Sequence, residues 1–320
     1  MAKVGVTGAS GFIGGALVPR LAAEGHDLVL IDDHTGPLRV EHATWPVEEL
    51  DFSSSESLAL LADCDVVLHL GAVSGVMTCA EDPVGSARIN LGGTQKLVDS
   101  SRARHVPVVF ASSFAVVGHP ERLPVTEDTP ARPTHEYARQ KAEGEQIVYG
   151  PEAGRTAPCS VIRMSNVYGS YQANGTTIGK GNVVNLFSQQ AATGRLAVNA
   201  PGTQRRNFVH IQDVLAHWLA AVRFVRDHPQ PATYLFNCAG DEAFSVLEIA
   251  DKFVRLWAEV RPGTPPLRVE VVPNPRAAIE LVDPEFSVSR DRTARLLGLT
   301  NQHRVDDTIR ELLRLSGTGR

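Results

Sequence analysis

Short apolar runs alternate with longer segments of helical periodicity along the first half of the chain. The runs at 4–7, 27–31, 66–70, 106–111 and 159–163 are rich in valine, isoleucine and leucine, and each has the length of a strand. Such a series of apolar strands is typical of a parallel sheet that helices cover on both faces.

Two segments between these strands have the periodicity of helices. They cover residues 12–24 and 83–103, and the second begins with Asp82 as a cap and Pro83 at the first helical position. A third helix is predicted over Glu136–Tyr149. This alternation predicts an α/β fold with a Rossmann-type doubly wound parallel sheet.

The pattern changes after the strand at 159–163. A glycine-rich polar stretch follows at 169–181, and proline-rich segments occur at 262–266 and 273–275. This change predicts a smaller C-terminal α/β lobe. The expected division is a Rossmann domain at 1–168, to which 206–240 returns, and a second lobe at 169–205 and 241–315.

Composition excludes several classes of protein. The 320 residues carry a net charge of -5, with 21% charged residues, which gives no general attraction to nucleic acid or an anionic membrane. No apolar run approaches the ~20 residues of a membrane span, and the N-terminus lacks the pattern of a signal peptide. The four cysteines and eleven histidines show no metal-binding spacing. We therefore expect a cytoplasmic protein with reduced thiols, no metal, and neither nucleic acid nor membrane as partner.

A glycine turn follows the first predicted strand directly. Its sequence is Gly8-Ala9-Ser10-Gly11-Phe12-Ile13-Gly14, and a helix begins inside it. Glycines allow the backbone to turn tightly and approach a pyrophosphate, whose charge the N–H groups and the helix dipole stabilise. The context of strand, turn and helix predicts a dinucleotide site made by Gly8, Gly11, Phe12, Ile13 and Gly14.

An acidic residue, Asp32, ends the second predicted strand. A carboxylate there accepts hydrogen bonds from both hydroxyls of the adenosine ribose and repels a 2′-phosphate, so NAD is favoured over NADP. Asp33 is an alternative for this role, and nearby Arg39 weakens the case against NADP. Asp51 and Phe52 are expected near the adenine, although Asp-Phe-Ser-Ser is also the pattern of a helix cap.

Tyr137 and Lys141 stand four residues apart in the third predicted helix, so both side chains project from one face. A phenol has a pKa of about 10, which a neighbouring ammonium and an oxidised nicotinamide both lower. Lys141 can also hold the nicotinamide ribose. Downstream of a glycine turn, this pair predicts a catalytic base and its partner.

Two serines end the preceding strand, at the edge of the sheet where ligands bind in open α/β folds. Ser112 and Ser113 are both candidates for a hydroxyl that orients the substrate, and either could instead cap the turn through Phe114. Asn90 in the segment 83–103 is a candidate to form hydrogen bonds with backbone groups near the active site. A plain surface residue is the alternative.

The chain resembles the extended short-chain dehydrogenase/reductases, and among them the nucleotide-sugar 4-epimerases. The resemblance runs in order from Lys3 to about Leu315. Its motifs are T-G-A-S-G-F-I-G, L-H-L-G-A, N-L-G-G-T, S-S-F-A-V-V-G, Y-A-R-Q-K-A-E-G-E, R-M-S-N-V-Y-G and R-R-N-F-V-H-I-Q-D-V.

The resemblance implies that the domain at 1–168 binds NAD and that the second lobe binds the substrate. It also implies roles for individual residues. Ser113 would orient the substrate, with Tyr137 as the base and Lys141 as its partner. Further cofactor contacts would come from Leu70, Gly71, Ala72 and Asn90. Substrate contacts would come from Ser74, Phe114, Asn166, Asn182, Val183 and two arginines on the diphosphate, Arg206 and Arg276. The helices at 83–103 and 136–149 resemble those that pair in related homodimers.

Several positions depart from the family pattern. Val117, Ala138-Arg139 and Asn207 stand where a tyrosine, Gly-Ser and an aspartate are usual. Phe114-Ala115 stands where 4,6-dehydratases carry an acidic pair, so elimination of water lacks its proton carriers. The stretch after Arg276 is longer than usual, which leaves the role of this second arginine open.

These observations predict an NAD-dependent 4-epimerase of a nucleotide sugar, a UDP-hexose or UDP-uronic acid, that acts through a 4-keto intermediate. A dehydrogenase or reductase of a sugar or sugar acid needs the same catalytic residues, but not the nucleotide-binding set Asn166, Asn182 and Arg206. A non-catalytic NAD-binding protein has no need of Tyr137 and Lys141 together.

Overall fold

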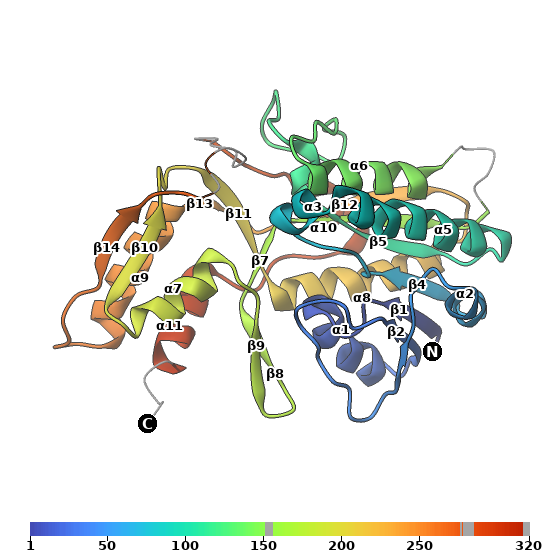
Figure 1. Ribbon diagram of the computed structural model, residues 1–320, viewed down its shortest axis with the longest axis horizontal. Helices are drawn as coiled ribbons and strands as arrows, with labels where there is room; N and C mark the ends of the chain where they lie inside the picture. The colour runs from blue at the N-terminus through green and yellow to red at the C-terminus, as the bar shows by residue number, and fades with distance from the viewer. Residues whose placement is uncertain (151–155, 276, 278–284, 316–320) are drawn as a thin grey trace.

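The central sheet is parallel and lies in the larger of two lobes (Figure 1). The computed structural model describes residues 1–150, 156–275, 277 and 285–315. Within these ranges the sheet has seven strands in the order β12-β6-β5-β4-β1-β2-β3. Their bounds are β1 Lys3–Thr7, β2 Asp27–Asp32, β3 Val47–Glu49, β4 Val66–His69, β5 Val108–Ser113, β6 Cys159–Met164 and β12 Thr233–Cys238. The predicted Rossmann-type sheet is confirmed.

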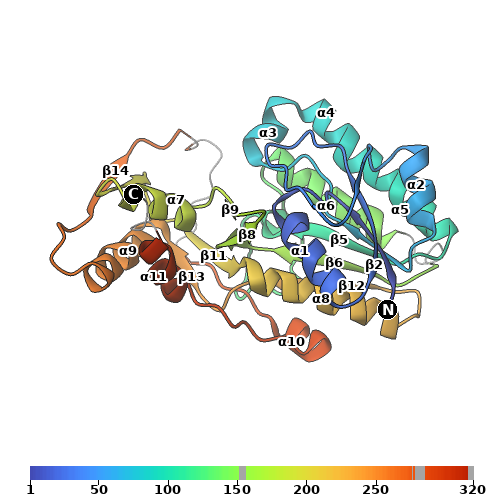
Figure 2. The same cartoon turned by 90° about the horizontal axis from the view of Figure 1, so that it is seen from below.

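Helices cover both faces of this sheet (Figure 2). Successive strand residues point to opposite faces, so Leu30 and Ile31 belong to different apolar clusters. Leu30 packs in the cluster that includes Trp218, and Ile31 in the cluster that includes Leu97. The helices are α1 (Phe12–Ala23) and α8 (Ile211–Asp227) on one face, and α2 (Ser55–Ala62), α5 (Thr94–Ala103) and α6 (Glu136–Tyr149) on the other.

The smaller lobe has an apolar core of its own. Phe187, Phe253 and Ile309 are fully buried there, one from each of three helices. These are α7 (Val183–Ala191), α9 (Val246–Val260) and α11 (Val305–Leu315), packed beside strands β10 (Arg195–Asn199) and β14 (Arg268–Val272). Figure 1 shows this lobe on the left, beyond β7 and β11.

The chain crosses between the lobes several times. A three-stranded sheet joins β7 (Asn166–Tyr168), β11 (Arg205–His210) and β13 (Ala243–Ser245). Strand β11 leads directly into α8, and α10 (Asp291–Leu297) packs against α8 and β12 of the larger lobe.

The glycine-rich stretch after β7 forms a hairpin that reaches the larger lobe. Its strands are β8 (Ser170–Ala173) and β9 (Thr176–Gly179). Tyr171 Oη donates to the carbonyl of Phe12 (2.9 Å), and the two rings lie 5.6 Å apart. The domain boundaries stay a prediction.

The predicted helix at 83–103 is not regular. Helix α4 (Pro83–Ala87) begins with Asp82 as cap, as expected, but a π-helical turn, η1 (Arg88–Gly93), separates it from α5. A Cβ on Gly93 would lie 2.8 Å from the Phe52 ring, so glycine is needed for this close approach. The wider turn buries Asn90, which is 5% exposed and therefore no surface residue. Helical periodicity cannot reveal such a local change of pitch.

Three further observations concern the described residues as a whole. No helix among them is long and apolar enough to cross a membrane. They contain no group of three or more histidine, cysteine, aspartate or glutamate side chains arranged to hold a metal ion. All four cysteines are buried free thiols.

Candidate active site

The glycine turn lies against the loop that leaves β4. Gly8 has φ +70°, and a Cβ on it would lie 2.7 Å from the amide nitrogen of Gly71. A Cβ on Gly14 would collide with the carbonyl oxygen of Gly8. Gly11 is the N-cap of α1 and contributes no capping side chain, so the N–H groups at Phe12 and Ile13 open an uncapped helix. This geometry fits a phosphate-binding turn.

Asp32 contacts this turn, whereas Asp33 does not share its contacts. Asp32 Oδ2 accepts a hydrogen bond from the amide of Ser10 (2.9 Å), and Oδ1 accepts one from His34 N (2.8 Å). Asp33 instead accepts from the amide and hydroxyl of Thr35. Of the two candidate ribose ligands, Asp32 is therefore the one placed beside the glycine turn.

The residues expected near the adenine lie beside the loop after β4. Phe52 is buried, with its ring 4.8 Å from the His69 ring, and it also lies beneath Gly71. Asp51 accepts from the amide of Ser53 (2.7 Å) in the turn before α2. The helix cap that the Asp-Phe-Ser-Ser pattern also allowed is made by Ser54, which accepts from Ser57 N (3.1 Å). Leu70, Gly71 and Ala72 leave the sheet at this point and are partly buried.

The catalytic candidates meet at the carboxyl end of β5. Tyr137 is in the first turn of α6 and hydrogen-bonds to the hydroxyls of Ser113 and Ser74. Lys141, one turn later, is 6% exposed, and its Nζ donates to the carbonyl of Ala111 (2.9 Å). The structure thus brings Ser113, Tyr137 and Lys141 together and adds Ser74 to them.

Burial dominates the electrostatics of this pair. It raises the pKa of Tyr137, while the hydrogen bonds from Ser74 and Ser113 lower it. Burial also lowers the pKa of Lys141 to about 8, and the Lys180 ammonium acts in the same direction. The expected lowering of the phenol pKa by positive charge must therefore overcome desolvation of the phenolate.

A buried ion pair, which the sequence motifs did not indicate, connects α6 to the strand β6. Glu145 is paired with Arg163 of β6 (Nη2 to Oε2, 2.7 Å), and both side chains are almost fully buried. Ser112 donates to Glu145 Oε1 (2.6 Å). Ser112 therefore contacts this pair, whereas Ser113, on the other side of the strand, faces Tyr137. Ser113 also caps the turn at Phe114, as the alternative allowed, because its Oγ accepts from the amide of Ala115 (3.2 Å). The signal in the sequence was a glutamate four residues after Lys141, too common a feature to single out.

The predicted substrate residues of the smaller lobe gather around β7 and β11. Asn166 Nδ2 donates to the carbonyl of Asn207 (3.0 Å), and Arg206 Nη1 donates to that of Arg205 (2.8 Å). Asn182 caps α7 by accepting from Val184 N (2.9 Å), and its Nδ2 donates to Val167 O (2.6 Å). Val183 is the first residue of α7. Arg276 lies outside the described residues.

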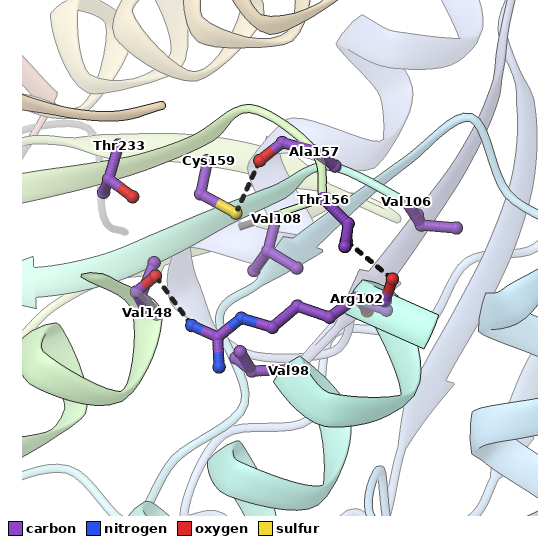
Figure 3. Close-up of a pocket in the computed structure, with 10 residues that line it drawn as sticks. Val98, Arg102, Val106, Val108, Val148, Thr156, Ala157, Cys159 and Thr233 are labelled. Atoms are coloured by element: carbon purple, nitrogen blue, oxygen red, sulfur yellow. Dashed lines mark hydrogen bonds between the residues drawn. The ribbon is translucent and has the colours of Figure 1, made fainter. Parts of the chain in front are cut away.

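A small cavity lies elsewhere, beneath the C-terminal end of α6 (Figure 3). Apolar side chains such as Val98 and Val148 line it, and Arg102 crosses it to donate to the carbonyl of Val148 (3.2 Å). It contains none of the predicted site residues.

Comparison with known proteins identifies relatives of this fold. Residues 4–238 match the NAD dependent epimerase/dehydratase family. A UDP-glucose 4-epimerase of Mycolicibacterium smegmatis is 33% identical over 227 residues, which cover 68% of this chain and 72% of that protein. Among solved structures, a UDP-glucose-4-epimerase from Stenotrophomonas maltophila with bound NAD and formylated UDP-arabinopyranose has a TM-score of 0.82. It is 22% identical, with 99% of this chain and 98% of that chain covered.

One structural relative is named for a different reaction. TunA, an NAD dependent NDP-hexosamine 5,6-dehydratase involved in tunicamycin biosynthesis, has a TM-score of 0.79 and is 24% identical over 100% of this chain and 99% of that one. The fold therefore serves more than one outcome at a sugar carbon, and the site residues must decide between them.

Proposed function

The chain belongs to the NAD dependent epimerase/dehydratase family, and from this premise we propose that it is a nucleotide-sugar 4-epimerase. The observation that carries the proposal is the placement of Tyr137. Its phenol contacts two serine hydroxyls, and it shares a helix face with Lys141 at the edge of the sheet beside the glycine turn. This set can move a proton to and from a sugar hydroxyl.

The residues present fit a bound NAD, in agreement with the predicted cofactor, which the family confirms. The glycine turn leaves no room for side chains at Gly8 and Gly14, and α1 begins without a capping side chain, so its N–H groups can receive a pyrophosphate. Asp32 would hold the adenosine ribose and Lys141 the nicotinamide ribose. Transfer of a hydride from the sugar carbon and back is the chemistry that bound NAD would supply.

The proton steps fall to this chain's own side chains. Tyr137 as phenolate would remove the proton of the sugar 4-hydroxyl, while Ser113 orients that hydroxyl by a hydrogen bond. Burial disfavours the phenolate, and the nearby Lys141 ammonium would stabilise it. Loss of hydride and proton gives a 4-keto sugar. Once the sugar has turned over, Tyr137 returns the proton to the same oxygen, and the configuration at C4 is inverted.

The smaller lobe would hold the nucleotide. Arg206, from β11, and Asn166, from the neighbouring β7, come from paired strands that adjoin the larger lobe, and Asn182 with Val183 begins the helix above them. A guanidinium suits a diphosphate because it donates in a fixed fork. We propose UDP as the nucleotide, since the relative in Mycolicibacterium smegmatis acts on UDP-glucose by name. The sugar would be a hexose or a uronic acid.

Elimination of water is a second alternative, after the dehydrogenase or reductase, and TunA shows that the fold also occurs in a dehydratase. The two residues after Ser113 argue against it. Phe114 is buried with its ring 6.4 Å from Phe286, and Ala115 has no side chain that carries a proton. Neither can replace the acidic pair that the resemblance places there in 4,6-dehydratases.

A panel of nucleotide sugars with catalytic NAD tests the proposal. We expect one UDP-hexose or UDP-uronic acid to be converted to its C4 epimer, seen by NMR, without a steady rise in NADH absorbance. A dehydrogenase would form one NADH for each sugar oxidised, and a dehydratase would release a deoxy-keto sugar. Either of these outcomes would replace the epimerase assignment.

We also propose a cytoplasmic homodimer that pairs through α5 and α6. Four buried free thiols suit a reducing compartment. The outer faces of the two helices expose Gln95, Lys96, Asp99 and Glu143, so pairing would be partly electrostatic. Light scattering should give twice the monomer mass at low salt and a smaller mass at high salt. A monomer at every salt concentration would exclude the dimer.

A further inference from the structure

Gln140 lies within the Y-A-R-Q-K motif, between the two catalytic side chains, and makes contacts of its own. It is 1% exposed. Its Nε2 donates to Ser86 Oγ of α4 (2.9 Å) and to Glu136 Oε1 (2.6 Å). Its Oε1 accepts from Asn90 Nδ2 of η1 (2.6 Å). Gln140 therefore connects the catalytic helix to the π-helical turn beside it.

A charged neighbour determines which end of this amide faces Asn90. The carboxylate of Glu136 is held by Arg139 through Nε (2.9 Å) and Nη2 (2.6 Å). The Arg139 hydrogen bond lowers the pKa of Glu136, so at neutral pH this carboxylate accepts hydrogen bonds and donates none. The NH₂ group of Gln140 must face it, and the amide oxygen is left for Asn90.

Asn90 extends this constraint to the loop after β4. Its Oδ1 accepts from the amide of Val73 (2.8 Å), and its Nδ2 donates to the carbonyl of the same residue (2.9 Å). Both backbone groups of Val73 are thus fixed. The next residue is Ser74, whose hydroxyl hydrogen-bonds to Tyr137, and α3 (Val76–Glu81) begins two residues later.

We propose that Gln140 is a positioning residue that acts through Asn90 and Val73 to hold the Ser74 hydroxyl against Tyr137. Ser74 is then a second hydroxyl, beside Ser113, that stabilises the phenolate. The proposal deepens the proposed function and rests on it for the identity of the reaction. The arrangement itself concerns the protonation of Tyr137, which can be measured without a substrate.

The physical effect follows from the surroundings of the phenol. Burial disfavours the phenolate, and the Cys79 thiol of α3 acts in the same direction when ionised. His135, whose ring stacks on Tyr137 at 6.2 Å, has its own pKa lowered by burial and stays neutral. Lys141 is the cation on the same helix face. A hydroxyl that donates to the phenolate favours the charged form, so loss of Ser74 raises the pKa of Tyr137.

Ultraviolet difference titration of the enzyme with NAD, with Tyr137→Phe as the reference, measures this pKa directly. We expect Ser74→Ala to raise it by about 0.5 to 1 unit, the scale of one hydrogen bond. Gln140→Met, which keeps the volume but removes the amide, should raise it by a similar amount. The double variant should show no further rise, because both changes remove the same contact.

Two outcomes would overturn the proposal. Gln140→Met with an unchanged pKa, while Ser74→Ala raises it, would show that Gln140 does not position Ser74. Additive effects in the double variant would show that the two residues act separately. Gln146→Met is the matched control, since Gln146 is exposed on the same helix. In this variant the pKa of Tyr137 should equal that of the wild type. Ser74→Ala carries the test even where Gln140→Met fails to fold.

Turnover separates this proposal from the proposed function. On the epimerised sugar, both single variants should lower kcat about 3- to 10-fold at a pH below the phenol pKa. The pH profile of kcat should move to higher pH by the same amount as the phenol pKa, and KM should stay within about twofold. A wild-type enzyme that epimerises no nucleotide sugar would refute the proposed function alone, because the phenol titration still decides the role of Gln140. Raised KM at unchanged kcat would instead assign Ser74 to substrate binding and overturn its role on Tyr137.

Discussion

The two lobes differ in how their site residues are held. In the larger lobe, Tyr137 and Lys141 are fixed by contacts with Ser113 and with the carbonyl of Ala111, at the place where chemistry is expected. In the smaller lobe, Asn182 caps its own helix and Asn166 contacts its own small sheet. The geometry proposed for catalysis is thus built into the fold. The proposed substrate contacts would have to form in exchange for internal ones, which costs binding energy.

The largest effect is expected in the larger lobe, where the site residues are already held in place. Tyr137→Phe removes one oxygen from a group that touches two serines and should lower turnover by about 10² to 10⁴. The ring still fills its partly buried site, so the fold and NAD binding should persist. Single-turnover rates and a titration with NAD measure both. Near-normal activity would show that the preformed site is not the catalytic one.

The variant Lys141→Met tests how much folding stability is lost by holding a buried ammonium in place. The pKa of Lys141 is about 8 in the folded protein against 10.5 ordinarily, so below pH 8 the fold holds a buried charge that the unfolded chain solvates. The unfolded state binds more protons between pH 8 and 10.5, and wild-type stability should therefore rise through that window. Lys141→Met should remove this rise and gain up to about 3 kcal/mol at neutral pH.

Urea unfolding at pH 7 and pH 10 measures this difference, and turnover and NAD affinity should fall in the same variant. A Met variant less stable than the wild type at pH 7 would mean that the bond from Lys141 to Ala111 outweighs the desolvation of the ammonium.

The smaller lobe supplies the next effect. Arg206→Ala should raise KM for the nucleotide sugar by roughly 10- to 100-fold, the scale of one lost charge-assisted contact, and leave NAD affinity unchanged. Arg205→Ala is the control, because Arg205 pairs with Glu248 (2.8 Å), within the smaller lobe. Equal effects of both variants on KM would place the diphosphate contact elsewhere.

Much of the larger lobe could be predicted from local patterns. The glycine turn and the Tyr137–Lys141 pair each lie within a few residues along the chain, and apolar runs mark the strands. The π-helical turn at Asn90 and the Glu145–Arg163 pair could not be, because they depend on which distant side chains meet. Gln140 was hidden for the same reason: its partners lie on α4 and η1, about fifty residues earlier in the chain.

An effect of similar size is expected at Asp32, which combines the two situations. Its contact with the amide of Ser10 in the glycine turn is already made in the fold, whereas its contact with the ribose is proposed. The purified protein should bind NAD at least tenfold more tightly than NADP. Asp32→Asn loses the charge that repels a 2′-phosphate and one charged acceptor for the ribose, at a cost of about 1 to 3 kcal/mol for NAD.

The preference for NAD should therefore shrink in Asp32→Asn, mainly through weaker NAD binding, as measured by titration with each cofactor. Asp33→Asn is the matched control, because Asp33 contacts Thr35 and not the glycine turn. It should keep the wild-type preference. If the preference persists in Asp32→Asn and is lost in Asp33→Asn, the ribose ligand is Asp33, and the contact of Asp32 with Ser10 serves only the shape of the turn.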